Sequence, residues 1–217
     1  MEAEFWRGRW REGSIGFHEG APNAYLTTYL GELPGTRVLV PLCGKTEDLA
    51  YLASHGREVI GIELVEDAVR TFFAEHAVEP EITRRGVLTQ YTAGAVTIFA
   101  GDVFAVTRDD VGTIDAIYDR AALVALPPEM RERYVAHLGA LAAAATPVLL
   151  VTLAYPQDRM QGPPFSVPDA EVRAHYDAVV QLEERPAVGG RASDVGAMER
   201  CYRAALRTGP ASSAHSS

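Results

Sequence analysis

Apolar runs that alternate with helical patterns in the first half of the chain limit the possible folds most. Short apolar runs at 38–40 and 59–62 are each followed by a stretch with helical spacing, at 46–54 and 65–76. A strand–helix–strand–helix order is typical of a parallel sheet covered by helices. We therefore predict an α/β fold with a doubly wound, Rossmann-like, seven-stranded and mostly parallel sheet.

Weaker patterns complete this sheet. Residues 87–91 and 96–100 flank a glycine-containing turn and indicate a hairpin. Further strands are expected at 114–118, 148–153, 179–184 and 196–206, and further helices at 129–145 and 169–176. Thr46 is expected to cap the helix that begins there.

Two helical patterns precede the first strand, at 2–12 and 22–30, with a glycine-containing loop between them. Residues 1–35 are therefore predicted to form a short helix, a flexible loop and a second helix. The hydrophobic content of 47% and the length of 217 residues fit one domain over residues 1–206. Residues 207–217 are small and polar, and we expect a disordered tail or a cloning remnant.

Charge and composition restrict the partners. A net charge of −9 disfavours nucleic acid, which is usually bound by a basic face. A signal-peptide core and a long apolar run are both missing, so a cytoplasmic protein without a membrane partner is expected. Cys43 and Cys201 are too few for a disulfide framework, and the six histidines lack ligand spacing, so no metal site is expected. We expect a monomer.

Residues directly after the predicted strands carry the functional signal, because ligands of doubly wound sheets bind beyond the carboxyl ends of the strands. Glu63 ends the second strand, 19 residues after Gly44, and is placed to bind both hydroxyls of a ribose. The first turn holds a single glycine, which is too few for a pyrophosphate motif. Leu39 stands where a P-loop requires glycine, so ATP and GTP are disfavoured. Asp102 could bind the adenine amine or simply cap a helix.

Several motifs extend this pattern. They are W-x3-W at Trp6 and Trp10, G-F-H at 16–18, P-L-C-G-K at 41–45, G-I-E at 61–63, Y-D-R-A-A-L-V-A at 118–125 and G-P-P-F-x-V at 162–167. Together they resemble the thiopurine S-methyltransferase family, in its bacterial form, over roughly residues 5–170. The turn at 41–45, the segment at 118–125 and G-P-P-F are the specific ones.

The resemblance implies a class I S-adenosylmethionine-dependent methyltransferase that releases S-adenosylhomocysteine. It also implies that residues 1–35 form an N-terminal helical lid over the cofactor. The acceptor would be the sulfur of a small aromatic or heterocyclic thiol, with selenium and tellurium species as further acceptors. The cofactor residues implied are Trp6, Trp10, Phe17, Leu42, Gly44, Glu63, Asp102, Val103 and Arg120. The acceptor residues implied are Phe17, Arg120, Pro163, Pro164, Phe165 and Arg191, the last standing for a basic residue before the final strand.

The predicted chemistry needs no metal and no covalent intermediate, because the donor is already activated and the enzyme must mainly align the reactants and exclude water. Trp10 and Phe17 could hold the cationic donor by cation–π attraction worth about 0.5–2 kcal/mol. Arg120 and Asp119 are the predicted catalytic residues. Arg120 would favour the thiolate, while Asp119 could orient Arg120, relay a proton, or act only as a backbone cap. Cys43 is expected to be a small packing residue rather than a nucleophile.

Two other functions remain open at this point. Methylation of halide or thiocyanate ions uses a related scaffold, although Phe17 and the Gly162–Phe165 segment disfavour it. A cofactor-binding protein without turnover is the second alternative. Analysis of the products formed with iodide and with a thiol tests the halide alternative. Cofactor binding without methyl transfer to any of a broad panel of acceptors would indicate a protein without turnover.

Overall fold

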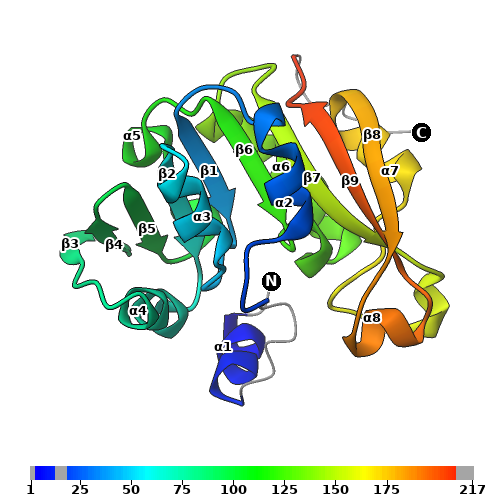
Figure 1. Cartoon of the computed structure of the whole chain (residues 1–217), viewed down its shortest axis with the longest axis horizontal. Coiled ribbons are helices and arrows are strands. Elements are labelled where there is room, and N and C mark those ends of the chain that lie inside the picture. Colours follow the sequence, from blue (N-terminus) through cyan, green and yellow to red (C-terminus); the bar gives the residue numbers. More distant parts are fainter. Residues whose placement is uncertain (1–2, 13–18, 209–217) are drawn as a thin grey trace.

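A mixed β-sheet forms the centre of the molecule (Figure 1). The computed structural model describes residues 3–12 and 19–208, and in these residues nine strands pair in the order β3-β4-β5-β2-β1-β6-β7-β9-β8. The strands are β1 (Arg37–Pro41), β2 (Glu58–Glu63), β3 (Glu81–Arg85), β4 (Leu88–Ala93), β5 (Val96–Ala100), β6 (Ala116–Arg120), β7 (Pro147–Ala154), β8 (Asp177–Pro186) and β9 (Met198–Ala205).

The predicted α/β class is confirmed, but the predictions of seven strands and a mostly parallel sheet are wrong. Of the pairings between described strands, four are parallel and four antiparallel. The strand ranges expected from the sequence already amount to eight, one more than the predicted seven, and each overlaps an observed strand. The ninth strand, which no expected range covers, is β3, whose five residues are all exposed and mostly polar or charged. A strand of this kind gives no apolar alternation in the sequence, and its pairing with β4 holds it in place.

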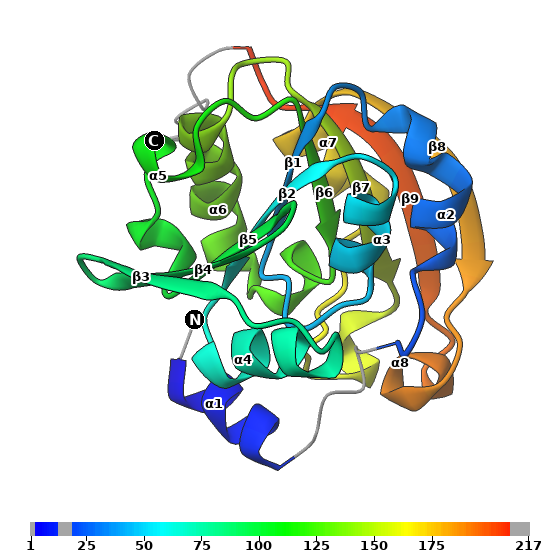
Figure 2. The same cartoon turned by 60° about the vertical axis from the view of Figure 1, so that its left-hand side comes forward.

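Helices cover both faces of the sheet (Figure 2). The helices α2 (Ala24–Tyr29), α3 (Asp48–Ser54) and α4 (Glu66–Glu75) bury apolar residues against one face, where Val38, Val40 and Val59 lie. The helices α5 (Arg108–Val111), α6 (Pro128–Leu141) and α7 (Asp169–His175) cover the other face, where Leu39 and Ile60 lie. The central strands are therefore buried on both sides, which explains their continuous apolar runs.

Three smaller differences concern the helices. Helix α3 begins at Asp48 rather than at Thr46, whose hydroxyl accepts a hydrogen bond from the Asp48 amide at 3.3 Å. Helix α6 ends at Leu141, because Ala142 is extended and Ala145 has a φ of 61°. Helices α5 (Arg108–Val111) and α8 (Gly190–Asp194) were not predicted. Short 3-10 helices complete the chain: η1 (Leu30–Glu32), η2 (Val103–Ala105), η3 (Leu123–Ala125) and η4 (Gln157–Arg159).

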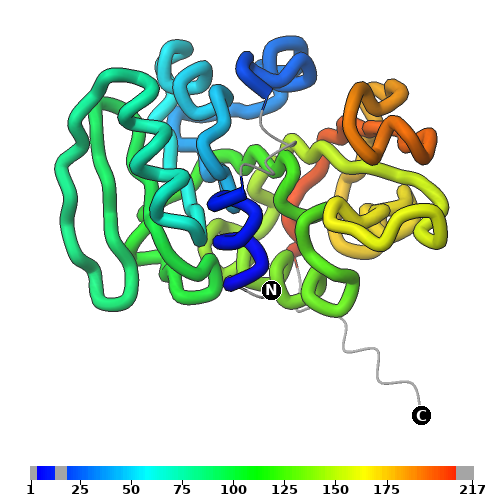
Figure 3. The backbone as a smooth tube through the Cα atoms, turned by 90° about the horizontal axis from the view of Figure 1, so that it is seen from below, coloured from blue at the N-terminus to red at the C-terminus, as the bar shows by residue number. Residues whose placement is uncertain are grey.

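The first helix, α1 (Ala3–Arg11), lies beyond the carboxyl ends of the strands (Figures 1 and 3). It is followed by residues 13–18, which lie outside the described part of the chain, as do 209–217 of the predicted tail. None of the helices in residues 3–12 and 19–208 combines the length and the apolar character that a membrane crossing requires.

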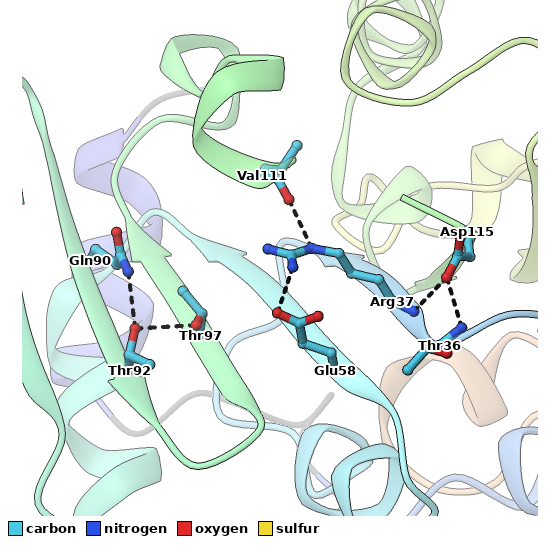
Figure 4. Close-up of polar contacts among 8 residues, drawn as sticks. All are labelled: Thr36, Arg37, Glu58, Gln90, Thr92, Thr97, Val111 and Asp115. Atoms are coloured by element: carbon cyan, nitrogen blue, oxygen red, sulfur yellow. Dashed lines mark hydrogen bonds and ion pairs between the residues drawn. The ribbon is translucent and has the colours of Figure 1, made fainter. Parts of the chain in front are cut away.

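The opposite, amino end of β1 is held by a polar network (Figure 4). The Asp115 carboxylate accepts hydrogen bonds from the backbone amides of Thr36 and Arg37, at 2.7 and 2.8 Å. The Arg37 side chain donates to the Val111 carbonyl and pairs with Glu58 at the start of β2. The amino ends of β1, β2 and β6 are thus tied together, which fixes the level at which their carboxyl ends stop.

Gly35 makes this network possible, and replacing it gives a prediction for the fold. Its φ is +75°, and a Cβ added there would lie 2.3 Å from the Asp115 Cβ. We expect Gly35→Ala to lower the free energy of unfolding by the cost of a left-handed alanine, about 1–2 kcal/mol, plus about 1–3 kcal/mol for the clash. Urea unfolding measures this. The matched control is Gly56→Ala, which has a φ of +77° and no atom within 4 Å; equal losses in both variants would contradict the clash.

Candidate functional site

A cavity of about 340 Å³ lies at the carboxyl ends of the central strands. Its wall is formed by α1, the turn after β1, the end of β2, the segments that follow β6 and β7, and the segment 187–192. This volume falls in the range of small-molecule sites. The position is the one expected for a ligand site in a doubly wound sheet.

The turn after β1 forms part of this wall through Leu42 and Gly44. Both have left-handed backbones, with φ angles of 49° and 55°. Cys43, between them, is buried, and a Cβ on Gly61 of β2 would lie 2.9 Å from its Sγ. The Cys43 thiol therefore packs over Gly61, and burial raises its pKa well above the ordinary value, which suits packing better than nucleophilic chemistry.

Glu63 ends β2 and is 7% exposed. Its carboxylate accepts hydrogen bonds from the amide of Gly44 at 2.8 Å and from the amide of Val65 at 2.7 Å. Burial raises the pKa of this carboxyl, and the backbone amides counteract that rise. The side chain is therefore fixed at the point where β1 and β2 end, and it faces the cavity.

Arg120 ends β6 and lines the same cavity. Its guanidinium forms an ion pair with Glu19, from the segment that leads into α2. Its side chain is 11% exposed. Glu19 also lines the cavity. The structure thus places a largely buried cation next to the turn after β1, with the Glu19 carboxylate as its partner.

Asp119 lies next to Arg120 in the chain but is absent from the cavity wall. Its carboxylate accepts a hydrogen bond from the Tyr134 hydroxyl of α6 at 2.8 Å and one from the Leu123 amide at 3.2 Å. Adjacent residues of a strand face opposite sides, which explains why Arg120 and Asp119 diverge. Burial raises the pKa of Asp119 to about 6.

On the far side of Arg120, Pro163 and Pro164 line the cavity together with Arg191 of α8. Phe165 is partly buried next to them, and its amide donates to the Val124 carbonyl at 2.7 Å. The G-P-P-F segment is thereby tied to the segment that follows Arg120.

The remaining predicted residues differ in whether they line the cavity. Asp102 caps η2 by accepting from the Phe104 amide at 3.0 Å, and Val103 is buried in the core. Neither belongs to the cavity wall, although the Gly101 amide just before them donates to the Glu63 carbonyl at 2.8 Å. Trp6 and Trp10 of α1 line the cavity. Phe17 lies outside the described residues.

Sequence reasoning missed several residues of the cavity wall, among them Glu19, Thr152 and Glu199. Thr152 ends an apolar run, so the search of strand ends could have found it. Its hydroxyl is buried and has no hydrogen-bond partner among the described residues. Glu199 comes from an antiparallel strand whose position in the sheet is not encoded locally. Across residues 3–12 and 19–208, no group of three or more His, Cys, Asp or Glu is arranged to hold a metal ion.

The arrangement fits a nucleoside cofactor bound next to an acceptor. A buried carboxylate at the end of β2 can bind ribose hydroxyls, and Leu42 and Gly44 of the turn after β1 line the cavity beside it. The Arg120 guanidinium can hold an anionic sulfur.

Two solved methyltransferase structures share this fold. The 1,6-didemethyltoxoflavin-N1-methyltransferase of Burkholderia thailandensis, with bound S-adenosylhomocysteine, gives a TM-score of 0.62 at 17% identity over 94% of this chain and 87% of that chain. A magnesium protoporphyrin IX methyltransferase from Synechocystis, also with S-adenosylhomocysteine, gives 0.53 at 17% identity over 84% and 79%. These identities establish the fold alone.

Sequence relatives are much closer. A thiopurine S-methyltransferase of Pseudomonas paraeruginosa is 51% identical over 187 residues, which cover 85% of this chain and 86% of the relative. One from Xanthobacter autotrophicus is 47% identical over 209 residues, covering 93% and 98%. The thiopurine S-methyltransferase family model matches residues 1–196. The chain therefore belongs to the thiopurine S-methyltransferase family of S-adenosylmethionine-dependent methyltransferases.

Proposed function

We propose that this methyltransferase moves the methyl group of S-adenosylmethionine onto the sulfur of a small aromatic or heterocyclic thiol, with selenium and tellurium species as further acceptors. The observation that carries the proposal is the Arg120 guanidinium, which shares one cavity with Glu63 and the turn after β1. The names of the relatives from Pseudomonas and Xanthobacter support the same acceptor class.

On the donor side, Glu63 binds the ribose hydroxyls, and Leu42 and Gly44 bound the space beside them. Asp102 and Val103 follow β5, the strand next to β2, and border the adenine. Trp6 and Trp10 cover the donor, so α1 acts as a lid. When bound, S-adenosylmethionine supplies a methyl group that is already activated by its sulfonium charge.

On the acceptor side, Arg120 stabilises the thiolate, because a nearby cation lowers the pKa of a thiol. It orients the sulfur but does not accept its proton, because a guanidinium stays protonated. A thiolate must share Arg120 with Glu19 or displace it. Pro163, Pro164 and Phe165 enclose the ring, and Arg191 adds a second cation at the rim.

Asp119 has two possible roles, and its contacts favour the structural one. Both carboxylate oxygens are engaged, by the Leu123 amide and the Tyr134 hydroxyl. These bonds hold the segment after β6 against α6, and this places Arg120 indirectly. The direct catalytic role predicted from the sequence stays a hypothesis, which the Asp119 variant described below tests.

Product analysis tests the proposed acceptor. Purified protein is incubated with S-adenosylmethionine and, separately, an aromatic thiol and iodide, and mass spectrometry identifies the products. We expect the S-methylated thiol with a kcat/KM at least ~100-fold above that for iodide. Preference for iodide would instead establish the halide alternative. Cofactor binding without transfer to any acceptor would indicate a protein without turnover.

Glu63→Ala tests the donor side. Two hydrogen bonds from ribose hydroxyls to a carboxylate are worth about 1.5–3 kcal/mol each, so the affinity for S-adenosylhomocysteine is expected to fall ~100-fold or more. Calorimetry measures the affinity. Glu58→Ala, at the other end of β2, is the matched control and should bind normally. Unchanged affinity in Glu63→Ala would place the ribose elsewhere.

Arg120→Ala tests the acceptor side. The loss of the cation that stabilises the thiolate should lower kcat ~100-fold with a weakly acidic thiol, while cofactor affinity and melting temperature change little. Arg203→Ala is the control, because Arg203 is an exposed arginine of β9 that forms an ion pair with Glu32. A large fall in melting temperature without a specific loss of turnover would make Arg120 a structural residue.

Asp119→Asn distinguishes the structural role of Asp119 from the catalytic one, because the two roles predict different effects on stability and turnover. Because the folded pKa of about 6 lies above the ordinary value of 3.8, ionisation of Asp119 destabilises the fold as pH rises from about 4 to 6, by about 3 kcal/mol in total. The variant should lack this loss and gain stability above pH 6, with turnover within ~3-fold. Asp109→Asn on α5 is the control. A ~100-fold loss of kcat at unchanged stability would instead make Asp119 a catalytic residue.

A further inference from the structure

Glu199 lies in the cavity on the opposite side of Arg120 from the donor residues. It is near the start of β9, where it pairs with Leu153 of β7 and with Arg185 of β8. Because β9 is antiparallel to β7, the start of β9 meets the carboxyl ends of the parallel strands. The strand order places Glu63 on β2 and Glu199 on β9, four strand spacings of about 4.8 Å apart, with Arg120 on β6 between them. Glu199 therefore borders the acceptor half of the cavity.

The surroundings of Glu199 leave its carboxylate available. Among the described residues, none donates a hydrogen bond to it, whereas Glu63 accepts two. The backbone of Glu199 is held, since its carbonyl accepts a hydrogen bond from the Tyr25 hydroxyl at 3.3 Å. The Glu199 carboxylate therefore lines the cavity on a fixed strand, and it accepts no hydrogen bond from the described residues.

Charges of both signs act on this carboxylate. Burial raises the pKa of Glu199, Glu19 raises it further, and Arg120 and Arg185 lower it. Arg9 and Arg191 line the same cavity. The net direction is upward, so Glu199 binds a proton more readily than an exposed glutamate.

The proposed acceptor class has a proton that Arg120 cannot take. A heterocyclic thiol with a ring nitrogen beside the sulfur exists largely as the thione, with an N–H next to C=S. Its sulfur becomes a strong nucleophile only when the N–H proton leaves. The position of Glu199 beyond Arg120 suits a ring whose sulfur points to Arg120 and whose nitrogen points to β9.

We propose that Glu199 is the general base that removes the ring N–H proton of a heterocyclic thione while Arg120 holds its sulfur. This inference rests on the proposed acceptor class. In the step, the N–H bond breaks and the proton moves to the Glu199 carboxylate. The sulfur forms a bond to the methyl carbon, the bond from that carbon to the sulfonium breaks, and neutral S-adenosylhomocysteine leaves. The protonated Glu199 then returns its proton to water.

The test compares Glu199→Gln with wild type on two acceptors at the same pH. One is a heterocyclic thione with an N–H beside its sulfur, and the other is an electron-poor aromatic thiol that is already ionised. We expect kcat for the thione to fall ~100-fold, in the range that general bases contribute, and kcat for the ionised thiol to stay within ~3-fold. Glu184→Gln, on the neighbouring strand β8, is the matched control and should leave both rates unchanged.

A second readout needs no turnover. The ultraviolet spectra of a thione and its anion differ, so titration of the thione into the complex with S-adenosylhomocysteine reports its protonation state. Below the pKa of the free thione, wild type should bind the anion and Glu199→Gln the neutral thione. Glu199→Asp, which keeps a carboxylate, should restore part of the anion signal.

The pH dependence of the methylation rate tests the role of Glu199 as a base independently. A base acts only above its pKa, so wild-type kcat/KM for the thione should fall at acid pH, with an apparent pKa above the ordinary glutamate value, and Glu199→Gln should lack this fall. Equal losses for both acceptors, or an unchanged spectrum, would overturn the role of Glu199. If wild type methylates neither acceptor, the proposed function fails; if it methylates both and Glu199→Gln retains full activity on the thione, only the inference about Glu199 fails.

Discussion

The carboxylate of Glu63 joins the two strand ends on which the cavity is built. It is buried at the end of β2 and accepts hydrogen bonds from the amides of Gly44 and Val65, so the turn after β1 and the residues after β2 share one anchor. A buried carboxylate that lost these donors would be costly. The same contact fixes the left-handed turn at Leu42 and Gly44, and the donor side of the cavity depends on it.

We infer from the sheet order that the cavity is divided between donor and acceptor. Glu63 and the turn after β1 lie on one side, Thr152 and Glu199 lie on the other, and Arg120 stands between them on β6. In our account the donor methyl group and the acceptor sulfur meet near Arg120. The protein then needs only to align the donor with the acceptor and to remove one proton from the acceptor, because the donor is already reactive. Residues of both signs line the cavity, which suits a cationic donor next to an anionic sulfur.

The parts of the site that sequence reasoning found are those that local patterns encode. Glu63 and Arg120 follow apolar runs, so their positions at strand ends could be predicted from the order of residues alone, and the turn at 41–45 is a compact motif. β3 was missed because its exposed, mostly polar residues carry no alternation. Glu199 and Glu19 were missed because an antiparallel pairing and an ion pair across 101 residues bring them to Arg120, and neither leaves a local signal. Asp119 shows a further limit: its position in sequence beside Arg120 says nothing of the face it occupies.

A crystal structure of the protein with S-adenosylhomocysteine tests the central claim most directly. Our account predicts that the two ribose hydroxyls bind the Glu63 carboxylate and that the sulfur of the product points toward Arg120, leaving the space between Arg120, Thr152 and Glu199 open for the acceptor. A ribose bound away from Glu63, or a product that fills the space beside Glu199, would contradict the division of this cavity into a donor side and an acceptor side.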